Sequence, residues 1–433
     1  MSASTVDPVV AGPSLVNTLL GMRAAEYATV CFEHVLCDTT DLPNAWVAAE
    51  QACNGAGPPL RAGELPLSLE TLGAVRTDAR ASAANLRLDS AAVAAREILA
   101  LPAGALVCDV TTVDEGRDVS ELARAAELLA RSPGSVALCF GASVGRADLR
   151  AALAWDRPAA AIEAALSREL LRGCAVAADV RRLLPPGSQA PAAAFITAAP
   201  LFDAPGGELS AEDAALLGGA RLSSAKTGAL VVATLPAAPS ADVLAARARS
   251  VLRLLDGARH VALRCATKLP QTLAAAAEPH FCIVDGFGRP DEPSLRREAG
   301  DDDAAIFDWL EQGAPRGRIC VSVGVRHKAQ LRAYGGLGYD HAAKCLGTRG
   351  ADAALLGVRL LPGLAWASRP PPVKAGEVRL FCSLCAETFT VKKGHHFSKF
   401  DNVYCTRSCL NAHREKNYTA EILKGPTASD QGA

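Results

Sequence analysis

Four cysteines near the carboxyl end have the spacing that most clearly supports chemistry in this sequence. Two residues separate Cys382 from Cys385, and three separate Cys405 from Cys409. Two such pairs can direct four thiolate sulfurs at one point, which is the tetrahedral ligand set of structural zinc. Because four protein ligands leave no open coordination position, we expect the metal to fold this segment and not to catalyse a reaction. The sequence therefore predicts a zinc finger.

The predicted finger occupies residues 379–418, between a proline-rich linker at 369–378 and a flexible tail at 419–433. Its spacing and its Tyr404-Cys-x3-Cys ending resemble the FCS-, MYM- and TRASH-type fingers, a treble-clef group. The resemblance implies a docking module for a protein partner. Nucleic acid is a weaker alternative that rests on basic residues in the finger, which are Lys392, Lys393, Arg407, Arg414 and Lys416.

A second chemical signal is a glycine-rich stretch between residues 318 and 362. An apolar run at 319–323 ends in Gly324, and a glycine-rich loop, Gly335–Asp340, follows. Only a bare backbone approaches an anion closely, and the loops after the last strands of an α/β barrel commonly bind phosphate. This stretch therefore predicts a phosphate-binding turn.

The same stretch resembles the end of flavin-binding barrels, and over residues 202–362 the chain resembles the central FMN domain of glutamate synthase. Gly206-Gly-Glu-Leu209 and Ser240-Ala-Asp-Val-Leu244 are similar to segments of that family. The resemblance implies an FMN phosphate against Gly324 and Gly357, and a cation close to the flavin ring. The implied FMN-binding residues are Arg264, Lys268, Asp285, Gly286, Gly288, Gly324, Arg326, Gly357 and Arg359.

The chain also departs from that family. Arg359 follows Gly357 one residue late, and the cysteines of an iron–sulfur cluster and an N-terminal cysteine nucleophile are missing. A complete glutamate synthase is therefore excluded, and no catalytic residue is predicted. Two hypotheses remain: an FMN-dependent oxidoreductase that carries a docking finger, and a non-catalytic scaffold in which a degenerate barrel presents the finger to a partner.

The elements that position these residues follow from alternating apolar runs and amphipathic helices. Continuous apolar strands between helices indicate a parallel sheet covered by helices. We expect an α/β protein with a (β/α)8 TIM-type barrel at 66–368, after an N-terminal extension at 1–65; a doubly wound sheet is the alternative. A further strand is suggested at 28–36. The expected strands are 105–110, 135–140, 192–198, 229–234, 260–266, 281–285, 319–323 and 353–356.

The composition is that of a globular protein, with 50% hydrophobic residues and a formal net charge of −1. This balance gives no reason to expect an anionic membrane or nucleic acid as the main partner. The chain has 14 cysteines, and those outside the finger occur singly, so we expect them to be free thiols. No secretion signal or membrane-spanning run is recognisable, which predicts an intracellular protein, cytoplasmic or nuclear.

Overall fold

The computed structural model of the chain divides into two compact units, Met1–Ala367 and Ser368–Ala433, which we describe separately. It describes residues 15–18, 21–24, 29–40, 63–132, 136–174, 191–200, 209–236, 241–266, 281–285, 319–348, 377–381, 388–392, 397–399, 402–404, 407 and 410–411.

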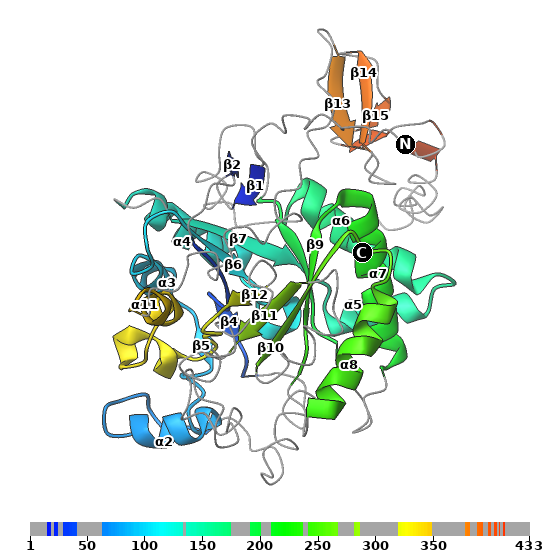
Figure 1. Ribbon diagram of the computed structural model, residues 1–433. Coiled ribbons are helices and arrows are strands. Elements are labelled where there is room, and N and C mark those ends of the chain that lie inside the picture. The colour runs from blue at the N-terminus through cyan, green and yellow to red at the C-terminus, as the bar shows by residue number, and fades with distance from the viewer. Residues whose placement is uncertain are drawn as a thin grey trace, which may run out of the picture. The chain divides into compact units, whose positions relative to one another are not determined.

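The first unit is built on an eight-stranded sheet whose strands are all parallel to their neighbours (Figure 1). The two end strands, β3 and β12, contact each other, and the Cys320 thiol lies 3.5 Å from the Val30 carbonyl oxygen across that seam. The sheet is therefore a nearly closed TIM-type barrel, as predicted. In spatial order its strands are β3 (Thr29–Glu33), β6 (Ala105–Asp109), β7 (Ala137–Ala142), β8 (Phe195–Ala198), β9 (Leu230–Thr234), β10 (His260–Ala266), β11 (Phe281–Asp285) and β12 (Ile319–Val321).

The first barrel strand, β3, lies within the predicted N-terminal extension. The barrel therefore begins before residue 66, and the predicted boundary is corrected. The physical reason is that residues 30–36 are buried, so this apolar run belongs to the core. Strands β6 to β12 match the other expected strands, except that the expected strand at 353–356 lies outside the described residues.

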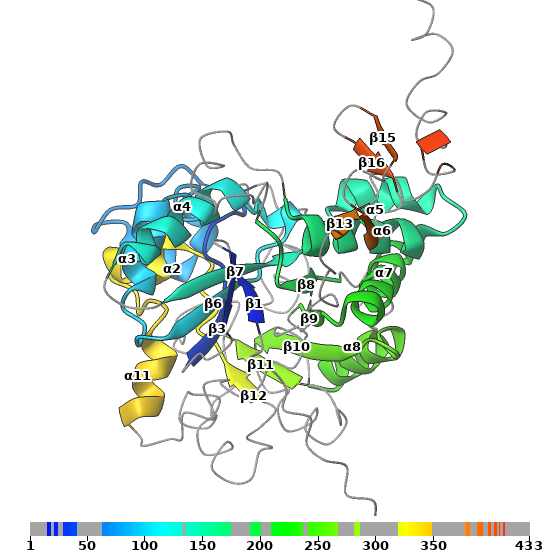
Figure 2. The same cartoon turned by 90° about the horizontal axis from the view of Figure 1, so that it is seen from above.

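Helices pack around the strands, with α2 to α4 and α11 on one side and α5 to α8 on the other (Figure 2). Helix α4 shows why they form: Asp118 caps its first turn by accepting the Glu121 N–H at 3.0 Å, and Leu122, Ala126 and Leu129 form a buried face. The helices are α2 (Leu72–Thr77), α3 (Ala91–Ile98), α4 (Val119–Ala130), α5 (Arg146–Leu153), α6 (Pro158–Arg172), α7 (Ala211–Thr227), α8 (Ala241–Leu254) and α11 (His341–Thr348), with 3-10 turns η1 (Ala79–Ala81), η2 (Val113–Glu115), η6 (Lys328–Gln330) and η7 (Arg332–Tyr334).

Two hydrophobic layers hold the barrel together. The outer layer lies between strands and helices and includes Val107, Leu138 and Val231. The inner layer fills the barrel and includes Phe32 and Phe195, whose rings meet edge to face at 5.9 Å. Because alternate residues of a strand face opposite sides, the two layers identify which residues point into the barrel.

Short antiparallel pairs complete the structure. In the first unit, β1 (Leu15–Thr18) pairs with β2 (Gly21–Ala24), and β4 (Cys37–Asp38) pairs with β5 (Arg87–Leu88). In the second unit, β13 (Glu377–Phe381) pairs with β14 (Thr388–Lys392), and β15 (Phe397–Lys399) pairs with β16 (Asn402–Tyr404). Among the described residues, no helix has both the length and the apolar character that a membrane crossing requires.

Candidate functional site at the carboxyl ends of the barrel strands

A layer of mostly polar residues caps the inner hydrophobic layer toward the carboxyl ends of the strands. The inner core contains Phe32, Ala262 and Ile283, so the strand alternation directs the residues two positions later into the same space. This end of a TIM barrel is where active sites are built. The members of this layer are His34, Gly141, Thr197, Thr234, Arg264, Asp285 and Ser322.

Arg264 is the central cation of this polar layer, and its side chain is fully buried. Its Nη1 lies 3.1 Å from His34 Nε2, and its Nη2 lies 2.8 Å from Asp285 Oδ2. Burial lowers the pKa of Arg264, while the Asp285 carboxylate raises it. Arg264 Nε is also buried and has no hydrogen-bond partner among the described residues. The guanidinium therefore has an unused donor next to an imidazole and a carboxylate.

The arginine fixes the protonation of His34. A guanidinium only donates hydrogen bonds, so His34 Nε2 accepts and Nδ1 carries the proton. Nδ1 lies 3.3 Å from Thr111 Oγ1, which in turn donates to Asp109 Oδ1 at 2.7 Å. Burial raises the pKa of Asp109 to about 6, against the hydrogen bonds from Thr111 and Val35 that lower it. A continuous chain of polar contacts thus runs from Asp285 to Asp109.

Two further contacts hold His34 in place. The Tyr339 hydroxyl donates to the His34 carbonyl oxygen at 2.9 Å, and Tyr339 comes from the loop that precedes α11. Glu115 Oε2 lies 4.0 Å from His34 Nδ1, and it accepts hydrogen bonds from the Thr112 N–H and hydroxyl. The segment after β6 therefore contacts the His34 imidazole, and the segment after β12 holds its backbone.

The turn predicted to bind phosphate is present, and an internal carboxylate fills it. Gly324 follows β12 with a φ of 67°, which favours glycine. The N–H groups on either side of it, from Val323 and Val325, donate to the two Glu33 oxygens at 2.9 and 2.8 Å. The donors expected to hold an FMN phosphate are therefore already occupied.

Other backbone N–H groups of this loop also donate to side chains of the chain itself. The Arg332 and Ala333 N–H groups donate to the Glu97 carboxylate at 3.0 and 2.8 Å. The Arg326 and His327 N–H groups donate to Gln330 Oε1 at 2.7 and 3.0 Å. The described residues of this loop therefore use these backbone donors for the chain's own side chains, while Gly357, the other half of the expected FMN phosphate site, lies outside the described residues.

The structure brings together only part of the predicted site. Arg264 and Asp285 form an ion pair, as two neighbouring strands place them side by side. The Arg326 carbonyl accepts the Cys37 thiol at 3.6 Å, and the positive charge of Arg326 lies near enough to lower the pKa of Arg264. The other predicted residues lie outside the described part of the chain, namely Lys268, Gly286, Gly288, Gly357 and Arg359 for FMN and Cys382, Cys385, Cys405 and Cys409 for zinc.

A metal ion does not fit the arrangement around His34. The Nε2 lone pair that would bind a metal already accepts from Arg264, and the guanidinium stands where a second cation would have to be. Within the described residues, no three or more His, Cys, Asp or Glu side chains are grouped so that they could hold a metal.

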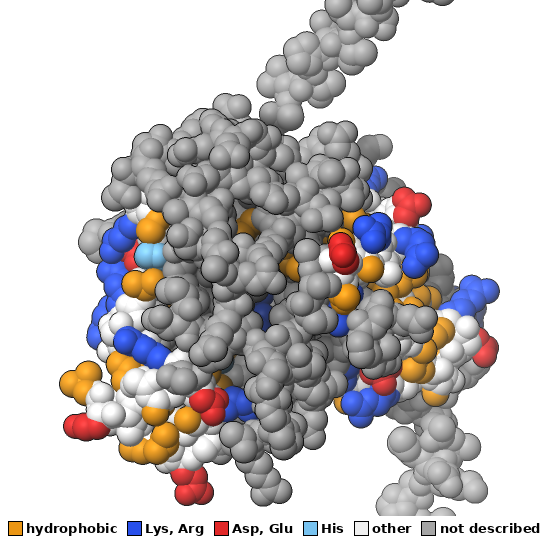
Figure 3. Space-filling model, turned by 60° about the horizontal axis from the view of Figure 1, so that its bottom comes forward, with side chains coloured by type: hydrophobic (Ala, Val, Ile, Leu, Met, Phe, Trp, Pro, Cys, Tyr) orange, Lys and Arg blue, Asp and Glu red, His pale blue; other side chains and the backbone are white. Residues whose placement is uncertain are grey.

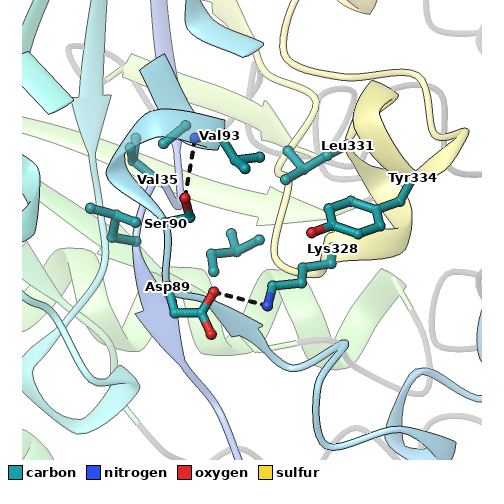
Figure 4. A pocket seen from close by; sticks show the side chains of 10 residues that line it. Val35, Asp89, Ser90, Val93, Lys328, Leu331 and Tyr334 are labelled. Carbon is teal, nitrogen blue, oxygen red and sulfur yellow. Dashed lines mark hydrogen bonds and ion pairs between the residues drawn. The ribbon is translucent and has the colours of Figure 1, made fainter. Parts of the chain in front are cut away.

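A surface pocket lies behind this polar layer, between α3 and the η6–η7 segment (Figure 4). Its lining is mainly apolar and includes Val35 and Leu331, and an ion pair of 2.8 Å joins Lys328 to Asp89 at its rim. It is a shallow depression: its empty volume of about 240 Å³ includes open solvent. In the described parts of the face shown in Figure 3, basic and acidic side chains are interspersed.

Comparison with solved structures supports the barrel fold but does not support the family that the sequence predicted. A resiniferatoxin-binding protein from Rhodobacter sphaeroides matches with a TM-score of 0.54 and 21% identity, over 81% of this chain and 94% of that one. A lactonase from Listeria monocytogenes matches with a TM-score of 0.51 and 15% identity, over 81% and 98%. A phosphotriesterase homology protein from Escherichia coli, with phosphate in its active site, matches with a TM-score of 0.50 and 15% identity, over 78% and 98%.

At these identities the similarity shows the fold alone. No known family profile matches the sequence, and no curated protein matches it either. These neighbours give no support to the predicted relationship with glutamate synthase or to FMN.

Sequence reasoning missed most residues that surround Arg264. Glu33 ends β3 and His34 follows it, in a run that the sequence only suggests as a strand, and Thr111 follows β6 in a loop without a motif. One signal was present: His34 comes two residues after Phe32, so the same alternation that buries Phe32 directs an imidazole into the barrel.

Proposed function

We propose that the barrel is a hydrolase of small esters, in which Arg264 binds the oxygen that becomes negative during the reaction. The observation that carries this proposal is the buried guanidinium at the carboxyl ends of the strands, with an unused Nε donor. Buried, preorganised donors of this kind stabilise a developing oxyanion. The lactonase and the phosphate-bound protein among the similar folds make carboxylic and phosphoric esters the classes to test first.

The same residues suggest how the reaction would proceed. Water adds to the carbonyl carbon or the phosphorus, and its proton passes to Asp285, which lies 2.8 Å from the guanidinium. The bond to the leaving alcohol then breaks, and the proton passes from Asp285 to the alkoxide. His34 does not act as the base here, because its Nε2 lone pair is held by Arg264. Its role is to orient the guanidinium.

The test is turnover of a panel of lactones, aryl esters and aryl phosphates by the full-length protein, with and without added divalent metals. Arg264→Gln is expected to lower kcat by about 100-fold or more, because it removes the oxyanion donor. Arg150→Gln is the matched control, since Arg150 pairs with Glu212 on the surface with its side chain 67% exposed. Absence of turnover on all three classes, or full activity of Arg264→Gln, would refute the proposal.

An FMN-dependent oxidoreductase is the alternative function, and the same purified protein can distinguish it from the hydrolase. It requires a flavin absorption spectrum in the purified or FMN-reconstituted protein. We expect a colourless protein, because Glu33 occupies the backbone donors that a flavin phosphate would need. A stoichiometric yellow complex would favour the rival.

We also propose that the second unit binds one zinc ion through Cys382, Cys385, Cys405 and Cys409 and docks a protein partner. Two features support it. The first cysteine pair falls in the chain between the paired strands β13 and β14, and Cys405 directly follows β16. Strand β13 also contacts β16, so each pair follows one of two adjacent strands. Metal analysis is expected to give one zinc per chain.

A further inference from the structure

The seam between the first and last barrel strands is closed by a side chain, and this contact has no part in the proposed hydrolysis. Glu33 is the last residue of β3 and is fully buried. Its Oε1 accepts from the Val323 N–H at 2.9 Å and from the Ser322 hydroxyl at 2.7 Å, and its Oε2 accepts from the Val325 N–H at 2.8 Å. The same hydroxyl also faces the Phe32 carbonyl oxygen, so one proton serves two acceptors.

These donors have the geometry of an anion-binding turn. Gly324 takes a positive φ of 67°, which directs the N–H groups on either side of it toward the same carboxylate. Successive backbone N–H groups in such a turn make a concave site for carboxylate or phosphate. Here the Glu33 carboxylate occupies it, from β3, the strand at the other edge of the sheet.

Burying the Glu33 carboxylate costs desolvation free energy, so its hydrogen bonds to the turn must offset that cost. The pKa of Glu33 is raised to about 7: burial and then the Asp285 carboxylate raise it, and the hydrogen bonds from Ser322 and Val325 lower it. The Arg264 guanidinium also faces it and lowers the pKa. The turn is therefore the main local compensation for a buried carboxylate, together with the nearby cation.

We propose that the Ser322–Val325 turn is an anion-binding cradle whose native occupant is the chain's own Glu33, which closes the barrel and excludes external carboxylate or phosphate. The cradle and its occupant lie on β12 and β3, the two strands at the ends of the sheet. Removing the occupant therefore does two things together: it weakens the seam, and it opens a site for a small anion.

Chemical rescue tests this directly. Glu33→Ala is expected to unfold at a lower temperature than the wild type at pH 8 in chloride. Sodium formate at the same ionic strength is expected to raise its Tm saturably, by about 1–2 °C or more, since each kcal/mol of binding shifts the Tm of a unit of this size by roughly that amount. Inorganic phosphate is the second probe and should act in the same direction if the space admits it.

Three controls make the result decisive. The wild type and Glu127→Ala should not respond to formate; Glu127 pairs with Arg131 on the surface of α4. Glu33→Gln should not respond either, because its amide fills the space. If Glu33→Ala folds only in formate, the proposal is supported. Equal behaviour of Glu33→Ala in formate and chloride, folded or unfolded, would overturn it, as would an equal response of Glu33→Gln.

Discussion

At the scale of single residues, this protein is unusual for the charges buried at one end of its barrel. Arg264, Asp285 and Glu33 all lie close to the strand ends and away from water. Each would be costly alone, and each is compensated by a specific partner: Asp285 for Arg264, and backbone N–H groups for Glu33. The stability of the barrel therefore depends on pairs, and loss of one partner leaves the other exposed to the full penalty.

The Arg264–Asp285 ion pair should contribute measurably to the stability of the barrel. Asp285→Asn should lower the free energy of unfolding by about 3–5 kcal/mol, because it leaves the guanidinium buried without its counterion. Urea denaturation followed by circular dichroism measures this. Asp38→Asn is the matched control: Asp38 pairs with Arg87 at 3.1 Å with both side chains about half exposed, and we expect less than about 1 kcal/mol. Equal effects of the two changes would contradict the prediction.

The stability of the barrel should depend on pH through two buried carboxyl groups, Glu33 and Asp109. The pKa is raised to about 7 for Glu33 and to about 6 for Asp109, mainly by burial. Both groups bind a proton more tightly in the folded than in the unfolded protein, so their contribution to stability is full below about pH 4 and is lost as the pH rises to about 7. The free energy of unfolding, measured between pH 4 and 8, should fall as the pH rises. In Glu33→Gln the fall should be smaller at the upper end of this pH range.

Among the secondary-structure elements, the contact between α6 and α7 depends on a glycine. A Cβ added to Gly219 of α7 would lie 2.4 Å from Ile162 Cγ2 and 3.1 Å from the Ala159 carbonyl oxygen of α6. Nothing in the alanine-rich sequence of α7 distinguishes this position, because alanine and glycine both fit an amphipathic pattern. The close approach of α6 to α7 explains why a glycine occupies position 219.

Gly219→Ala should therefore destabilise the barrel by about 1–3 kcal/mol, although alanine is the better helix former. Gly73→Ala in α2 is the matched control, because a Cβ there meets nothing within 4 Å. That change should be neutral or stabilise by about 0.5–1 kcal/mol through helix propensity. Thermal unfolding of both variants tests whether their changes in stability have opposite signs. If both variants were stabilised, or both destabilised, packing against α6 would not be the reason for glycine at position 219.

At the scale of the whole molecule, the chain consists of two units that are expected to be stabilised differently. The barrel has a large apolar core, whereas the second unit is described only as two short hairpins. Small units of this kind commonly need a metal to fold. The proposed zinc should therefore matter to one unit only.

Chelation, or the double change Cys405→Ser and Cys409→Ser, should make the region after residue 368 sensitive to protease while the barrel keeps its Tm. Limited proteolysis with mass spectrometry measures the first effect, and calorimetry the second. Changing Cys174 to Ser is a control for cysteine loss; this buried thiol, whose pKa burial raises to about 12, is not a metal ligand in the proposal. A second unit that stays resistant without zinc would contradict it.

The amino-acid sequence predicted an α/β protein and favoured a barrel over a doubly wound sheet, because apolar strands and the helices between them leave a periodic pattern that depends on local burial. The pairing of β3 at one end of the sheet, which closes it, became visible only in the structure. The sequence also placed Arg264 and Asp285 at strand ends and found the glycine turn at Gly324. Only the tertiary structure decided what those features contact. Glu33 and Gly324 lie far apart in the chain and meet only because the barrel closes, and a motif read locally could not show that the phosphate turn already holds a carboxylate.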